Sequence, residues 1–268
     1  MSTLAKRLLG TYRPGSTHWV GDGFHVRNLF PSNELGERLS PFLLLDYAGP
    51  TKFEPSREPR GVGEHPHRGF ETVTLMYQGR VAHRDSAGHS GVIGPGDVQW
   101  MTAASGVVHE EKYEREFSLQ GGVAQMVQLW VNLPRKDKMS APRYQDIMSE
   151  RIPVVESGSS RVRVIAGEFS GRRGPAKTFS PLELFDLRLG AGAELALDLP
   201  RDHTCAVVVL EGRARVNGSE PLGETELALL DLEGRDLPGD RRLPERPDGA
   251  SLTEFLGSGP LKAIPPLE

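Results

Sequence analysis

The sequence predicts an all-β protein, and three observations support this fold class. First, 31 glycines and 21 prolines are spread over 268 residues, where they interrupt regular elements and supply turn geometry. Second, the apolar runs at 42–45, 73–77 and 127–131 have the length and composition of strands. Third, long helical patterns are scarce. Together these features favour a β-sandwich or a β-barrel architecture.

The second half of the chain contains a weak repeat of the first half. Gly79-Arg80-Val81 follows the apolar run at 73–77, and Gly212-Arg213-Ala214 follows the run at 206–210 in the same way. A chain of 268 residues is long enough for two cores of ordinary domain size. We therefore predict two tandem barrels, residues 1–134 and 154–268, joined by a linker at 135–153.

The elements of the first half follow from the alternation of apolar runs and turn residues. In chain order we expect an approach strand and a turn-rich loop within 18–39, a buried strand at 41–47, a polar loop at 51–63, one strand at 65–77, a turn at 78–80, a strand at 81–85, and turns at 86–91 and 95–97 before a strand that carries residues 107–111.

Two pairs of polar side chains mark the candidate site. Residues two apart on a strand point to the same face, so His65 and His67 project together, as do His109 and Glu111. Three imidazoles and one carboxylate suit a divalent first-row metal such as iron, nickel, manganese, copper or zinc. A structural zinc site is more often rich in cysteine, and the chain has only Cys205.

Three nearby residues leave alternatives open. If 65–77 is one strand without a bulge, Glu71 shares the face of His67 and becomes an alternative ligand or an acceptor beside the ion. Glu110 should point away from the ion, but a bulge that shifts the register by one residue would put it in the place of Glu111. His83 lies either behind the site or at its rim.

Another set of side chains lies on the predicted strand at 126–131. Met126, Gln128 and Trp130 share one face of it. They either line the metal site or pack between sheets, and His89 belongs to an exposed turn.

Three segments of the sequence resemble a known family. The segments 65–72, 94–103 and 128–134 are similar to the N-terminal signature of the pirins, which belong to the cupin superfamily. The resemblance is dense over about 20–147 and thinner afterwards. It implies a bicupin, with two tandem cupin-type barrels and one metal site in the first.

The resemblance also assigns the ligands and the chemistry. It implies that His65, His67, His109 and Glu111 hold the ion, with iron first. The implied activity is a quercetinase-type dioxygenase that cleaves flavonols with dioxygen, and Glu111 or Glu71 would take the substrate hydroxyl proton. The alternative is a metal- or redox-responsive protein that binds a partner protein without turnover.

The second barrel should lack a metal site. When Gly212 is aligned with Gly79, Asp198 and Pro200 occupy the positions of the first histidine pair. The proline-rich end at 237–268 departs from the closing sequence of the pirins, which puts the C-terminal wall of the family fold in doubt here.

Bulk properties set further expectations. The net charge of −4 provides no general attraction for phosphate, so direct binding to nucleic acid is not expected. A single cysteine fits a reducing compartment, and we expect the cytoplasm. No stretch reaches the roughly 20 apolar residues of a membrane-spanning helix, and the N-terminus lacks the apolar core of a secretory signal.

Overall fold

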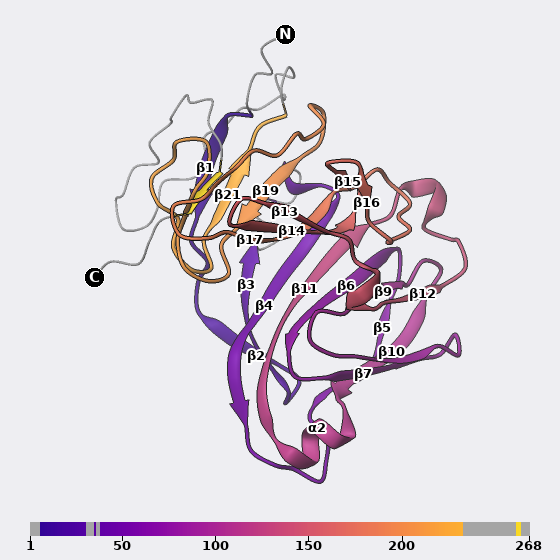
Figure 1. Ribbon diagram of the computed structural model, residues 1–268. Coiled ribbons are helices and arrows are strands. Elements are labelled where there is room, and N and C mark those ends of the chain that lie inside the picture. Colours follow the sequence, from indigo (N-terminus) through magenta and orange to yellow (C-terminus); the bar gives the residue numbers. More distant parts are fainter. Residues whose placement is uncertain (1–5, 31–34, 36–37, 233–260, 264–268) are drawn as a thin grey trace.

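The computed structural model describes residues 6–30, 35, 38–232 and 261–263. Their regular structure is mainly β-strand, and the strands form two units, a large one and a small one (Figure 1). The predicted all-β fold with two tandem barrels is confirmed. Most of the proline-rich end at 237–268 lies outside the described residues. Within the described part of the chain, no helix has both the length and the apolar character needed to cross a membrane.

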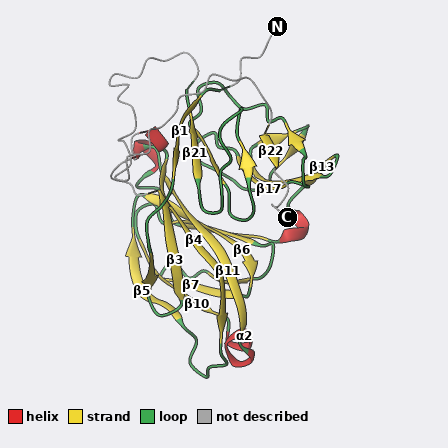
Figure 2. Cartoon of the chain, turned by 90° about the vertical axis from the view of Figure 1, so that its left-hand side faces the viewer, coloured by secondary structure: helices red, strands yellow, loops and turns green. Residues whose placement is uncertain are grey.

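Two sheets make the first barrel. A seven-stranded sheet has the order β12-β9-β6-β11-β4-β3-β2, and a four-stranded sheet has the order β5-β10-β7-β8. The strands are β2 (Thr17–Val20), β3 (Phe24–Phe30), β4 (Phe42–Phe53), β5 (Gly61–His67), β6 (Phe70–Gln78), β7 (Val81–Asp85), β8 (Ser90–Ile93), β9 (Val98–Thr102), β10 (Val107–Tyr113), β11 (Gly122–Asn132) and β12 (Arg143–Ile147). Helix α2 (Arg115–Gln120) lies at the far end of this barrel (Figure 2).

The second barrel is built from smaller sheets, with strand orders β1-β21-β19, β13-β14-β17, β18-β22-β20 and β15-β16. Its strands are β1 (Leu8–Tyr12), β13 (Val154–Ser157), β14 (Ser160–Ala166), β15 (Glu168–Phe169), β16 (Arg172–Arg173), β17 (Leu184–Arg188), β18 (Glu194–Leu195), β19 (Cys205–Val208), β20 (Ala214–Arg215), β21 (Leu227–Leu230) and β22 (Leu261–Ala263).

Two strand pairings cross the domain ranges expected from the sequence. β1, which falls within 1–134, pairs with β21 of the second barrel. β12, which falls within the expected linker at 135–153, pairs with β9 and extends the large sheet of the first barrel. The division of the chain at 134 and 154 remains a prediction. These pairings show that each barrel includes a strand from outside its expected residue range.

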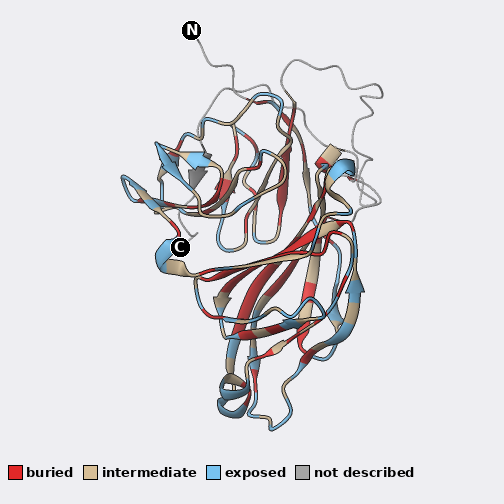
Figure 3. Cartoon of the chain, turned by 90° about the vertical axis from the view of Figure 1, so that its right-hand side faces the viewer, coloured by how far each residue is buried: buried red, intermediate tan, exposed pale blue. Residues whose placement is uncertain are grey.

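The central strands of the seven-stranded sheet, such as β6 and β9, are buried on both faces. One face turns into the first barrel, where Met76 and Met126 pack with residues such as Phe24. The other face lies against the second barrel, and Trp100 there joins a cluster that includes Leu229. Figure 3 shows these strands as the most buried part of the molecule. Such a sheet holds the side chains on its inner face rigidly.

The expected single strand at 65–77 is wrong. The chain divides into β5, in the four-stranded sheet, and β6, in the seven-stranded sheet. Gly69 lies between them with φ of 80°, a left-handed conformation that glycine adopts without steric cost. Side-chain alternation therefore does not continue from His67 to Glu71.

Candidate metal centre

Three histidines come together on two adjacent strands. β5 carries His65 and His67, and β10 carries His109, which lies directly opposite His65 in the antiparallel pairing. Their ring centroids are 4.4 to 4.8 Å apart, and one ligating nitrogen from each ring lies within 4.8 Å of the others. The predicted grouping of the three imidazoles is thus present.

Glu111 lies on the same strand as His109 and on the same face. Its carboxylate belongs to a second set of ligating groups, with His83 and His109, whose atoms also lie within 4.8 Å of one another. The two sets share His109. The other three residues predicted as ligands therefore lie around the His109 ring, with Glu111 in the set that contains His83.

A row of polar side chains on the large sheet holds the Glu111 carboxylate. Gln99 donates a hydrogen bond of 2.5 Å to Oε1, and Gln128 donates one of 2.8 Å to Oε2. Thr74 lies 3.4 Å from Oε1. Thr74 is the cross-strand neighbour of both glutamines, so the three side chains stand on one face. They fix the carboxylate in a single orientation.

Two histidines of the site, His67 and His109, are electrically neutral at neutral pH. Burial lowers the pKa of His67 to about 4, with further lowering by His109 and His65. Burial lowers the pKa of His109 to about 3, with further lowering by His65 and His83. A metal ion requires the neutral form of imidazole, so both rings are ready to act as ligands at neutral pH.

The nitrogen atoms of the site fit a bound ion. His109 is only 1% exposed, and its buried Nε2 has no hydrogen-bond partner among the residues that the structure describes, which is costly unless something binds it. The Nδ1 of His65 lies 2.8 Å from the carbonyl oxygen of Gly63. This contact holds the Nδ1 proton and leaves Nε2 of His65 for an ion.

Aromatic side chains border the site. The ring of Trp130 lies 5.1 Å from His67 and 4.6 Å from Phe70, measured between centroids. Its indole Nε1 donates to Oε1 of Gln128 at 3.2 Å. Gln128 and Trp130 thus contact site residues, whereas Met126 packs deeper in the barrel core.

Two acidic residues considered from the sequence lie elsewhere. Glu71 is buried on β6, accepts a hydrogen bond of 2.6 Å from Thr102, and lies 3.7 Å from Arg143. Because Glu71 and Thr74 have opposite parity on β6, Glu71 faces away from the histidines, and its expected place beside the ion is wrong. Glu110 binds Arg84 at 2.8 Å on the outer face of β10.

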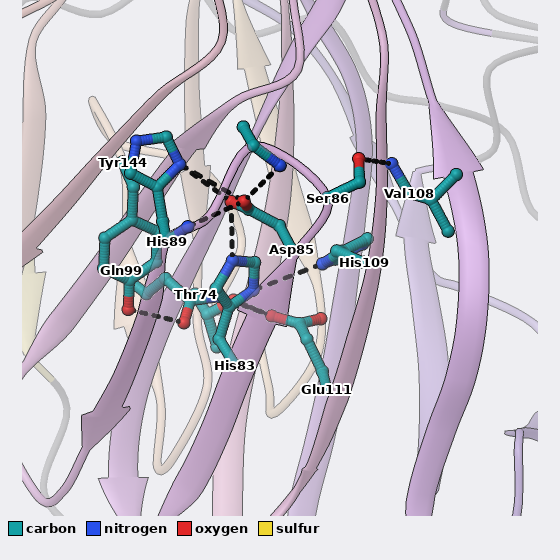
Figure 4. Close-up of polar contacts among 11 residues, drawn as sticks. Thr74, His83, Asp85, Ser86, His89, Gln99, Val108, His109, Glu111 and Tyr144 are labelled. Atoms are coloured by element: carbon teal, nitrogen blue, oxygen red, sulfur yellow. Dashed lines mark hydrogen bonds and ion pairs between the residues drawn. The ribbon is translucent and has the colours of Figure 1, made fainter.

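Sequence reasoning gave too little weight to the residues behind His109. Figure 4 shows His83, Asp85 and Tyr144 gathered there, with Gln99 close to Tyr144. His83 is 3% exposed, and its Nδ1 lies 3.3 Å from the Nδ1 of His109. The sequence left His83 open between two positions and gave no signal for Asp85. The available clue was parity, because His83 lies directly opposite Glu111.

The metal-free protein is expected to lose stability as the pH falls below about 6.5. In the unfolded chain a histidine takes up its proton near that value. In the fold, His67 does so only at about 4 and His109 at about 3. Between these values the unfolded chain binds more protons, so the free energy of unfolding decreases with falling pH.

Urea unfolding of chelator-treated protein from about pH 7 to about pH 5 measures this effect. His67→Gln should flatten the dependence, and His25→Gln, in a residue that lies outside the site, should not. An unchanged slope in His67→Gln would contradict the assignment.

Comparisons with known proteins show which family the chain is similar to. The family model described as Pirin matches residues 23–131. A protein of Pseudomonas aeruginosa named "Putative quercetin 2,3-dioxygenase PA2418" is 58% identical over 230 residues, which span 85% of this chain and 80% of that protein.

Solved structures show the same relationship. The 1.88 Å crystal structure of quercetin 2,3-dioxygenase from Acinetobacter baumannii matches with a TM-score of 0.83 and 52% identity, covering 85% of this chain and 80% of that one. Bacterial pirin YhhW from Escherichia coli, in complex with nickel(II), matches with a TM-score of 0.62 and 18% identity over 96% of this chain and 100% of that one, which is a likeness of fold alone. The chain belongs to the pirin family.

Proposed function

We propose that the protein is a mononuclear metal-dependent dioxygenase of the quercetinase type, which cleaves flavonols with dioxygen. The observation that carries this proposal is that the imidazoles of His65 and His67 and the carboxylate of Glu111 all lie close to His109, whose buried Nε2 has no hydrogen-bond partner among the described residues. Relatives that bear the name quercetin 2,3-dioxygenase support it.

His65, His67, His109 and Glu111 would hold one divalent ion. Iron is our first choice, and nickel, manganese, copper and zinc suit the same donors. A pirin of the same fold binds nickel(II). When bound, such an ion supplies Lewis acidity and open coordination positions.

The chain's own residues would orient the substrate and move its proton. The rings of Phe70 and Trp130, half-buried beside His67, offer a surface on which a flat flavonol could stack. Glu111 would accept the proton of the flavonol hydroxyl on a carboxylate oxygen. Gln99 and Gln128 would keep that carboxylate oriented during the transfer.

Oxygen uptake with quercetin, measured on metal-reconstituted protein, tests the proposal. Glu111→Gln should lower the turnover rate by about 100-fold or more, because it removes a proton acceptor and an anionic ligand. Glu71→Gln is the matched control, since Glu71 binds Thr102 on the opposite face of the sheet, and its rate should equal that of the parent protein.

Metal-loaded protein that consumes no oxygen would reject the dioxygenase. That outcome would favour the second function predicted from the sequence, a metal- or redox-responsive protein that binds a partner, whose capture of that partner should differ between the ferrous and ferric forms. Equal rates for Glu111→Gln and Glu71→Gln would instead reject the assigned base.

A further inference from the structure

The side chains behind His109 form a buried hydrogen-bonded group, whose role here rests on the metal site of the proposed function. The Nδ1 atoms of His83 and His109 lie 3.3 Å apart, and both rings are buried. Two ring nitrogens at this distance can form one hydrogen bond, in which one nitrogen carries a proton and the other accepts it. The direction of that bond decides which nitrogen of His109 is left bare.

Asp85 sets the direction from the other side of His83. Its carboxylate oxygen Oδ2 lies 3.2 Å from Nε2 of His83, and its side chain is 1% exposed. Burial alone would raise the pKa of Asp85, but hydrogen bonds from the backbone of His89 and from the His83 ring lower it overall. An ionised carboxylate only accepts, so Nε2 of His83 must carry the proton.

The proton on Nε2 of His83 determines where the other ring protons lie. With its proton on Nε2, His83 presents a bare Nδ1, which accepts the Nδ1 proton of His109. His109 then has no proton on Nε2, the nitrogen that is buried without a partner. We infer that His83, oriented by Asp85, is a positioning residue that holds His109 in the one tautomer whose Nε2 can bind a metal ion.

The same contacts argue against His83 as a ligand. His83 belongs to one of the two sets of ligating groups, with His109 and Glu111. Both of its ring nitrogens, however, already have protein partners, His109 and Asp85. A histidine ligand needs one free nitrogen, and within this pair only His109 has one.

Tyr144 fixes the plane of the His83 ring. The two rings are stacked, with centroids 4.8 Å apart and planes 17° from parallel. The Tyr144 hydroxyl donates to Oε1 of Gln99 at 3.1 Å, and Gln99 in turn donates to Glu111. As Figure 4 shows, one cluster therefore orients two of the proposed ligands, His109 through His83 and Glu111 through Gln99.

Asp85→Asn is the sharpest test, because the surroundings fix how the new amide must lie. Oδ1 of Asp85 accepts the backbone N–H groups of Ala87 at 2.9 Å and His89 at 3.0 Å. The amide oxygen should take that position, which leaves the NH2 group facing Nε2 of His83. The hydrogen bonds then reverse, and His109 acquires a proton on Nε2.

Two measurements test the effect of these substitutions, one on the tautomer of His109 and one on metal affinity. ¹⁵N chemical shifts of labelled histidines in the metal-free protein distinguish the two tautomers, and we expect the Nδ1–H form for His109 in the parent and the Nε2–H form in Asp85→Asn. Competition with a chelator measures the affinity for nickel(II), which should fall by about 10 to 100-fold in Asp85→Asn and in His83→Phe. Phenylalanine keeps the stacking on Tyr144 but removes the acceptor.

His89→Ala is the matched control, because it removes the other ring that contacts Asp85 and leaves the Asp85 to His83 contact in place. Its nickel affinity should equal that of the parent protein. A parent His109 in the Nε2–H form, or parent affinity in both Asp85→Asn and His83→Phe, would overturn the inference. A parent that binds no nickel would overturn the metal site of the proposed function, whereas the ¹⁵N shifts would still decide the tautomer.

Discussion

Replacement of His109 by alanine is expected to abolish tight metal binding, because His109 belongs to both sets of ligating groups around the site. Apparent binding free energies of four-ligand structural zinc sites are about 10–16 kcal/mol, so one ligand accounts for roughly 3 kcal/mol, or about 100-fold in affinity. Metal analysis of protein purified without added ions, together with a chelator titration, measures the loss.

The control for this variant is His25→Ala, in which the lost ring packs on Trp19 outside the site. Circular dichroism should show the same strand content in both variants and in the parent protein. If His109→Ala bound as much metal as the parent protein, the assignment of the metal centre would be wrong, and the proposed dioxygenase would be rejected with it.

Replacement of Trp100 by alanine is expected to cost about 3–5 kcal/mol of the free energy of unfolding. Trp100 is 0% exposed and lies in the cluster that the large sheet shares with the second barrel. Truncation of the indole removes a large apolar surface and leaves a cavity that a rigid sheet fills poorly. Urea unfolding at fixed pH provides the measurement.

Trp19→Ala is the matched control, since Trp19 is 53% exposed on the edge strand β2. Its effect should stay within about 0.5 kcal/mol, as is usual for a surface substitution. Similar losses in the two variants would mean that the shared cluster contributes little to stability.

The sequence was sufficient to predict the fold class and the grouping of the histidines, because both depend on patterns among residues that are close together in the chain. Strand alternation puts residues two apart on one face, so His65 with His67, and His109 with Glu111, needed only the assumption that their strands are neighbours. The structure shows β5 and β10 paired, with a register shift between His109 and Glu111. The extra residue of that shift lies on β5, so β10 keeps its alternation and Glu110 stays on the outer face with Arg84.

The rest depended on contacts that no local pattern records. The position of Glu71 was wrong because one glycine, Gly69, turns the chain into another sheet and resets the alternation. The contact between His83 and His109 joins residues 26 positions apart, and that between Tyr144 and Gln99 joins residues 45 positions apart. Such pairs are set by strand order, which the spacing of residues in one sequence does not specify.

Because β1 pairs with β21, the first few described residues belong to the second barrel. β21 lies between β1 and β19, and Arg7 also binds Asp231 just beyond it at 2.8 Å. A fragment cut from the chain at residue 135 would lack β1 and would present the unpaired backbone groups of β21 along a new sheet edge. Because exposed edges of this kind recruit strands from other molecules, the isolated C-terminal half would be prone to aggregation.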